Sequence, residues 1–269
     1  ASNTAVGRSA LEKNTTGSQN TAAGMNAMKA TTTGSLNAAV GDYSLDANTT
    51  GTRNASLGSE SLGSNTTGND NTGIGQCALK TNTTASENTA VGSYAIKLNT
   101  TGASNTAIGV NALCTNTTAS NNAAVGKSAL RLNTTGALNT AVGTEALCTN
   151  TTGGCNTAVG CGALQANTTA STNTAVGRNS LYSNTTGNTN TGMGYSALNG
   201  NTTGNGNTAF GYQALDVNTT AADNTAVGKG AADSTTTGDY TVAVGVNALG
   251  AQTTGACNTA VGHGAARAA

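Results

Sequence analysis

Few residues of this 269-residue chain are of the types that perform catalysis or bind metals, and their spacing is irregular. There are six cysteines, one histidine and eleven acidic residues. No Cys-x-x-Cys spacing occurs, His263 stands alone, and the carboxylates form no recurring pair. We therefore expect no catalytic residue, no metal site, no cofactor and no enzymatic activity. A lyase built on a β-helix would need a local cluster of acidic or basic residues, and none is present.

One chemically meaningful pattern does recur, the tripeptide Asn-Thr-Thr. It is an N-glycosylation acceptor if the chain passes through a glycosylating secretory route. We favour the alternative interpretation, in which these asparagines form an inward-facing row that no transferase reaches. The twelve candidate asparagines are Asn14, Asn48, Asn65, Asn82, Asn99, Asn116, Asn133, Asn150, Asn167, Asn184, Asn201 and Asn218.

The spacing of these asparagines reflects a tandem repeat that runs through the whole sequence. Its consensus, N-T-A-V-G-x-x-A-L-x-x-N-T-T-G-x-x, gives fifteen full copies over residues 3–257 and a partial copy over 258–269. We number the positions of this repeat as columns one to seventeen, with Asn3 in column one. No linker or change in composition interrupts the repeat, so we predict a single domain over residues 1–269.

A period of seventeen residues is too short for a helical repeat and is typical of a solenoid whose coils each contribute short strands. We predict an all-β fold, a parallel β-solenoid (β-roll or β-helix) of about sixteen 17-residue coils. At a strand spacing of about 4.8 Å, the coils would form a rod of roughly 75 Å. The segments N-T-A-V-G, A-L and N-T-T-G would form two or three short sides of the coil.

The column compositions predict which side chains face the interior. Column four is always apolar and column nine nearly always Leu, so we assign both to the interior, as at Val6 and Leu11. All charged residues and all six cysteines lie in columns six, seven, ten, eleven, sixteen or seventeen, which we expect to face solvent. Columns one and twelve would form two asparagine ladders, and of the adjacent threonines in columns thirteen and fourteen one would face in and one out.

Column five is glycine in every copy, which indicates either a positive φ or a close backbone approach. This structural glycine column comprises Gly7, Gly24, Gly41, Gly58, Gly75, Gly92, Gly109, Gly126, Gly143, Gly160, Gly177, Gly194, Gly211, Gly228, Gly245 and Gly262.

Composition and charge exclude several functional classes. Leu, Ile, Val and Phe total 35 residues, too few for a conventional globular core, and the absence of Pro and of net charge is unlike a disordered chain. A net charge of zero gives no electrostatic reason to bind nucleic acid or an anionic membrane surface. No apolar run approaches the ~20 residues of a membrane span, so we expect no membrane insertion.

The N-T-A-V-G-x-x-A-L motif resembles the head repeats of trimeric autotransporter adhesins and the N-T-A-V-G repeats of bacteriophage tail fibres. The resemblance covers the strand and small-residue part of all sixteen copies. It implies a left-handed parallel β-roll that associates as a homotrimer, located outside the cell or on a virion surface. A cell-surface glycan would be the corresponding partner.

Two functions remain open at this point. The leading hypothesis is a structural fibre element, a rigid rod of an extracellular filament, adhesin stalk or phage tail fibre that assembles with itself as a homotrimer or head-to-tail. Head-to-tail stacking is suggested by the phase of the termini, since Ala1 falls in column sixteen and Ala269 in column twelve. The alternative is an ice-binding β-solenoid that uses an exposed threonine ladder, with Thr15, Thr16, Thr134 and Thr135 as candidates.

Overall fold

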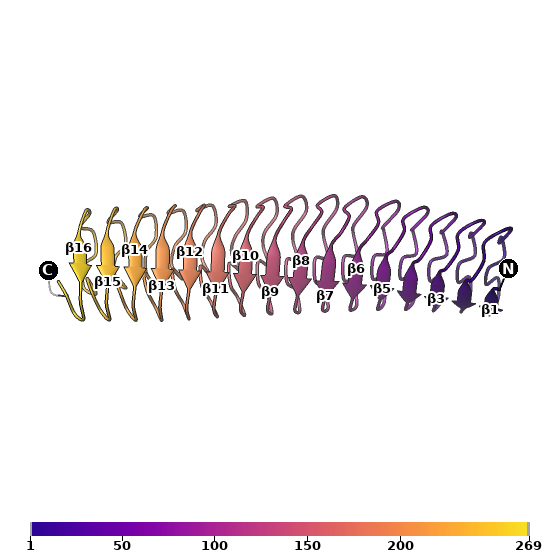
Figure 1. The fold of residues 1–269 in the computed structure, drawn as a ribbon, viewed down its shortest axis with the longest axis horizontal. Helices are drawn as coiled ribbons and strands as arrows, with labels where there is room; N and C mark the ends of the chain where they lie inside the picture. Colours follow the sequence, from indigo (N-terminus) through magenta and orange to yellow (C-terminus); the bar gives the residue numbers. More distant parts are fainter. Residues whose placement is uncertain (1, 268–269) are drawn as a thin grey trace. The chain divides into compact units, whose positions relative to one another are not determined.

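The computed structural model describes residues 2–267, and these residues contain strands and turns but no helix. Each 17-residue repeat forms one coil and contributes one strand of three residues. Figure 1 shows these strands stacked coil upon coil along each unit. The prediction of an all-β parallel solenoid is therefore confirmed. Only the N-T-A-V-G segment contains a strand; the A-L segment lies in turns and the N-T-T-G segment in bends, so the number of sides of the coil stays a prediction.

The chain divides into two compact units, Ala1–Thr135 and Gly136–Ala269. Both are built from the same coil, and the single uninterrupted domain expected from the repeat stays a prediction. The strands of the first unit are β1 (Thr4–Val6), β2 (Thr21–Ala23), β3 (Ala38–Val40), β4 (Ala55–Leu57), β5 (Thr72–Ile74), β6 (Thr89–Val91), β7 (Thr106–Ile108) and β8 (Ala123–Val125). Those of the second are β9 (Thr140–Val142), β10 (Thr157–Val159), β11 (Thr174–Val176), β12 (Thr191–Met193), β13 (Thr208–Phe210), β14 (Thr225–Val227), β15 (Val242–Val244) and β16 (Thr259–Val261).

Within each unit, every strand pairs in parallel with the strand of the next coil, in a register of seventeen residues. Thr157 lies opposite Thr174 and Val159 opposite Val176, for example. Backbone bonds between coils continue beyond the strands, as where Leu147 N donates to Ala163 O at 3.0 Å. Every residue therefore lies beside its own equivalent in the next coil, which is why the column compositions are so uniform.

The interior of the coil consists of alanine, leucine and asparagine side chains. The central residue of each strand, column three, points inward and is Ala in most coils; column eight is Ala and column nine Leu in most coils, and these side chains are largely inaccessible to solvent. A leucine buried in this way contributes about 1.5–3 kcal/mol through apolar transfer. The assignment of column nine to the interior is confirmed.

The assignment of column four to the interior is wrong. Val6 is 63% exposed and Val142 37%, and no column-four side chain of the described residues is buried. The reason is the alternation of side chains along a strand. Because the asparagine of column one and the alanine of column three face inward, columns two and four must face outward.

Three backbone positions per coil adopt a left-handed conformation without being restricted to glycine. Columns seven, nine and seventeen have φ values of 47° to 67° where they carry positive φ, as in Tyr43, Leu45 and Arg53. This conformation costs an L-residue roughly 1 kcal/mol each time, and here it lets seventeen residues close into one compact coil. Column composition gave no indication of it.

Candidate functional site

Two asparagine ladders lie inside the coil and share one row of acceptors. The backbone N–H of Asn54 donates to Asn37 Oδ1 at 2.9 Å, and Asn54 Nδ2 donates to the Gly68 carbonyl at 2.8 Å. From column twelve, Asn65 Nδ2 donates to the same Gly68 carbonyl and to Asn48 Oδ1, both at 3.1 Å. The expected amide ladders are thus present. They satisfy buried polar groups that would otherwise be costly.

The ladders fail where another residue replaces an asparagine. Five of the six buried side-chain polar atoms that lack a hydrogen-bond partner within the described chain lie at such positions or next to them. Column twelve carries Thr31, Thr235 and Gln252, and column one carries Thr241. The five atoms are Asn14 Oδ1, Thr31 Oγ1, Asn218 Oδ1, Asn224 Nδ2 and Gln252 Oε1.

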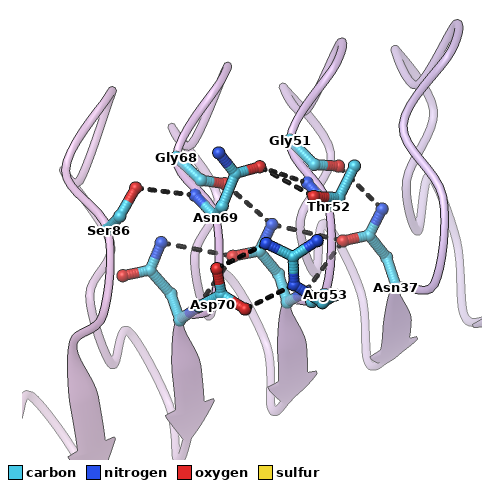
Figure 2. A network of polar contacts seen from close by, with 10 residues as sticks. Asn37, Gly51, Thr52, Arg53, Gly68, Asn69, Asp70 and Ser86 are labelled. Atoms are coloured by element: carbon cyan, nitrogen blue, oxygen red, sulfur yellow. Dashed lines mark hydrogen bonds and ion pairs between the residues drawn. The ribbon is translucent and has the colours of Figure 1, made fainter.

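The corner that precedes each strand carries a second polar network, nearer the surface and only partly buried (Figure 2). Asn69 Oδ1 accepts from Thr52 N at 2.7 Å, and Ser86 Oγ accepts from Asn69 N at 3.0 Å. In the next column, Arg53 binds Asp70 through two contacts of 2.6 and 2.8 Å. The hydrogen bond from Arg53 lowers the pKa of Asp70. Because both side chains are exposed, the pair adds little to stability.

The glycine column has both of the properties that its composition indicated. At Gly143, φ is +136°, and an added Cβ would lie 2.5 Å from the Gly160 carbonyl oxygen of the next coil. The same conflict recurs along the column, and only at Gly262, in the last coil, is the neighbouring space open. No side chain larger than hydrogen fits between stacked coils at this position.

The outward side chains of the strands form what we call the strand face, defined as the first and third residues of β1–β8 in one unit and of β9–β16 in the other. It contains threonine, alanine and aliphatic side chains, and no charged residue. Among its most exposed members are Leu57 at 49% and Phe210 at 53%. Reasoning from the sequence missed this surface, although the inward asparagine of column one could have revealed it through strand alternation.

The threonine columns lie on another side of the coil, and neither is buried. In column thirteen most hydroxyls donate to the threonine carbonyl of the next coil, as Thr117 Oγ1 does to Thr134 O at 3.2 Å. Column fourteen is exposed in every coil, including Thr16 and Thr135. The prediction that one of the two ladders faces inward is therefore wrong. Of the ice-binding candidates, Thr15, Thr16 and Thr135 are exposed and Thr134 is partly buried.

The glycosylation candidates are poorly placed for modification of the folded chain. Asn14 is partly buried, and the other eleven are fully buried, with relative exposures of 0%. Their amide groups point into the ladder; Asn99 Nδ2, for instance, donates to Asn82 Oδ1 and Gly102 O. This burial argues against Asn14, Asn48, Asn65, Asn82, Asn99, Asn116, Asn133, Asn150, Asn167, Asn184, Asn201 and Asn218 as acceptors once the coil has formed.

The charged residues and the cysteines differ in their exposure. No charged side chain of residues 2–267 is buried, as predicted. The expectation that all cysteines face solvent is wrong, because Cys77 and Cys148 are buried and Cys114 is partly buried. Desolvation raises the pKa of both Cys77 and Cys114. Cys77 lies in column seven and Cys114 and Cys148 in column ten, so neighbouring side chains cover both columns in some coils, which their variable composition did not indicate.

Neither a metal-ligand cluster nor a membrane-spanning helix occurs among the described residues. Across residues 2–267, no three His, Cys, Asp or Glu side chains come close enough to hold a metal ion. The same part of the chain contains no helix suited to crossing a bilayer. His263 is exposed in the last coil. The expectations of no catalytic residue and no cofactor stay predictions.

A pairing of small residues inside the coil escaped the sequence analysis. Wherever column eight carries Ser instead of Ala, column three of the next coil carries Ser or Gly instead of Ala: Ser44 with Ser56, Ser61 with Gly73, and Ser180 with Gly192. Ser180 Oγ donates to Gly192 O at 2.9 Å, and a Cβ on Gly192 would lie 2.5 Å from that hydroxyl. The two positions share one space. A serine in column eight is therefore accompanied in column three either by glycine, which has no methyl group, or by a second serine, whose hydroxyl bonds to the first.

The fold and the ladders place the chain in the class of parallel β-solenoids. No family model matches the sequence, and no curated protein matches it. The function is therefore argued below from the surfaces and their chemistry.

Proposed function

We propose that this protein is a structural fibre element that associates with itself through the strand face, outside the cell or on a virion surface. The observation that supports the proposal is the exposure of aliphatic side chains on consecutive strands, such as Val40, Leu57 and Ile74 on β3 to β5. Contiguous exposed apolar surface of more than a few hundred Å2 is uncommon in monomers and marks interaction sites.

A second copy of the chain is the partner that fits this surface best. Every strand face side chain repeats at the spacing of the coils, so a second strand face has the same period and can match it coil by coil. The surface carries no charge, which removes both repulsion and the cost of desolvating ions on contact. A homotrimer or a laterally paired filament would each bury it.

The proposal is tested by placing charge on the strand face. We expect Val40→Lys together with Ile108→Lys to abolish self-association, because two ammonium groups would have to be desolvated at the interface. The matched control is Thr50→Lys with Thr118→Lys, which adds the same charge at exposed column-fourteen positions. Mass by analytical ultracentrifugation and electron microscopy of negatively stained particles are the readouts. A monomeric unmodified chain at micromolar concentration would contradict the proposal.

Ice binding is the second candidate function, supported by the same uncharged strand face with threonine two residues before an aliphatic side chain. The exposed threonines of column fourteen form a second surface that could bind ice instead of the strand face. Thermal hysteresis of the unmodified chain is the first measurement, and its absence removes this candidate. If hysteresis is present, Thr135→Tyr and Thr140→Tyr distinguish the two surfaces, since only the change on the ice-binding side would abolish it.

A further inference from the structure

A glycine opens a notch in the side of the first unit. Column ten carries long or polar side chains in most coils, but Gly63 lies there between Asp46 and Lys80 of the adjacent coils. The resulting cavity measures about 330 Å3 and is lined by Tyr43, Asp46, Ala47, Glu60, Gly63, Ser64 and Lys80. This volume lies at the lower end of the range for small-molecule sites, about 300–1,000 Å3.

The walls of the notch combine an aromatic ring with polar groups of both kinds. Tyr43 lines the notch and is 40% exposed, so its side chain is accessible to a ligand there. An ideal Cβ on Gly63 would lie 3.5 Å from Asp46 Oδ1, which places that carboxylate directly beside the missing side chain. Lys80 Nζ contacts Glu60 Oε2 at 2.6 Å, so these two charges largely neutralise each other and hold their side chains in place.

We propose that this notch is a binding subsite for a single saccharide unit. A pyranose ring has one apolar C–H face, which suits the electron-rich face of Tyr43, and a rim of hydroxyls that both donate and accept hydrogen bonds. The carboxylates of Asp46 and Glu60 accept from hydroxyls, whereas Lys80 donates to them. The lining carries the carboxylates of Asp46 and Glu60 and the ammonium group of Lys80, and Lys29 of the preceding coil also acts on Asp46, so the charges are largely balanced and a neutral polyol fits better than an ion.

The chain contains a natural counterpart that lacks these features. Gly250 occupies column ten in the second unit, and Asp233 lies beside it, as Asp46 lies beside Gly63. Gly230 stands in the column-seven position that Tyr43 occupies in the first unit. Gly250 therefore has the glycine and one carboxylate but lacks the aromatic ring and, with Asn247 in place of Glu60, the second carboxylate, and it serves as an internal control for these two features together.

The inference concerns the partner of the proposed fibre and rests on that function only for its biological setting. Its test is ligand-observed saturation-transfer NMR on the unmodified chain with methyl glycosides of glucose, galactose, mannose and N-acetylglucosamine. We expect transfer to the protons of the apolar ring face of at least one glycoside, with a dissociation constant on the order of 1 mM. Saturation transfer reports contact between glycoside and chain in any oligomeric state. Saccharide binding can therefore succeed or fail independently of self-association.

Three variants locate the binding. Gly63→Gln fills the notch; glycine 63 has no positive φ, and column ten carries a glutamine at Gln165, so we expect a small shift of the Glu60 carbonyl, 3.2 Å from the added Cβ, to accommodate the change. Tyr43→Ser removes the ring and introduces a residue found elsewhere in that column, at Ser9. We expect both variants to weaken binding at least tenfold and Gly250→Gln to leave it unchanged. Circular dichroism checks that each variant folds.

Two outcomes would overturn the proposal. One is the absence of saturation transfer to all four glycosides at millimolar concentration, or equal transfer with Gly63→Gln. The other is binding of a zwitterionic amino acid such as glycine, probed in the same experiment, without binding of any glycoside. That result would assign the notch to an ammonium and a carboxylate held by Asp46 and Lys80.

Discussion

Single positions in this coil are constrained by their equivalents one coil away more than by their sequence neighbours. Gly143 is the clearest case, since both its φ of +136° and the Gly160 carbonyl exclude a side chain. We expect Gly143→Val to lower the free energy of unfolding by about 3 kcal/mol or more. Gly63→Ala is the control, because glycine 63 has no positive φ, a Cβ there would lie 3.2 Å from the nearest atom, and column ten carries larger side chains in most coils. Thermal and urea unfolding measure the difference, and equal stability of both variants would contradict the interpretation.

The serine and glycine pair gives a second prediction at this scale. Gly192→Ala alone forces a methyl group against Ser180 Oγ and should destabilise by about 1–3 kcal/mol. Adding Ser180→Ala restores the alanine pair found in most coils, so the double variant should recover the stability of the unmodified chain. The coupling between the two changes, measured by urea unfolding of all four proteins, should be about 1 kcal/mol or more. Additive effects would show that the positions do not share space.

At the scale of the element, the strand and the ladders form one structure. Each strand contributes only three residues to the parallel sheet. The asparagine side chains extend the hydrogen bonding between coils beyond the strands into the turns and bends. Asn71 shows this, because its backbone N–H and its Nδ2 both contact Asn54 Oδ1 while Nδ2 also reaches Ala85 O. A coil with such short strands is stable because its turns are bonded as regularly as its sheet.

Repair of a broken ladder should stabilise the second unit. Thr235→Asn supplies the amide that Asn218 Oδ1 lacks and a donor for the Gly238 carbonyl, which should raise the free energy of unfolding by about 1 kcal/mol. Thr235→Leu is the control, since its side chain resembles asparagine in shape and has no donor. The two variants are compared by urea unfolding, and a gain with leucine would attribute the effect to packing instead.

The sequence predicted the coil, its period and the ladders, but it did not predict the orientation of the strand. Uniform columns reveal stacking because each residue lies beside its equivalent, so the asparagine ladders, the glycine column and the solvent-facing charges followed directly. Hydrophobicity suggested that Val6 and its equivalents face inward. Strand alternation from the buried Asn20 and its equivalents places them outside, and a three-residue strand is too short for its own pattern to decide. The notch at Gly63 depends on residues from three coils, which no single repeat displays.

At the scale of the whole molecule, the coils are interchangeable modules whose contacts are of the same type throughout. Asn88 Oδ1 accepts from Asn105 N at 3.0 Å, and Ile96 N donates to Ala112 O at 3.0 Å. Removing the seventeen residues 105–121 would place Asn122 and Ala129 in these roles. Nothing in the bonding pattern of the first unit depends on the number of coils.

We therefore expect deletion of residues 105–121 to give a folded protein with the circular dichroism of the unmodified chain and a similar melting temperature. Deletion of residues 105–120 is the control, because it shifts every following column by one residue and places buried asparagines opposite outward side chains. Loss of structure in both deletions would mean that the coils are not equivalent.

The paired serines and glycines also bear on how such a gene can change its length. Recombination between similar repeats adds or removes whole copies. Most copies can be lost without changing the contacts between the coils that remain. Ser61 and Gly73 lie in neighbouring copies and compensate for each other. A crossover between their codons would leave one substitution without the other, at a cost in stability. Lineages of this gene should therefore gain and lose copies elsewhere, with these linked pairs inherited as single blocks.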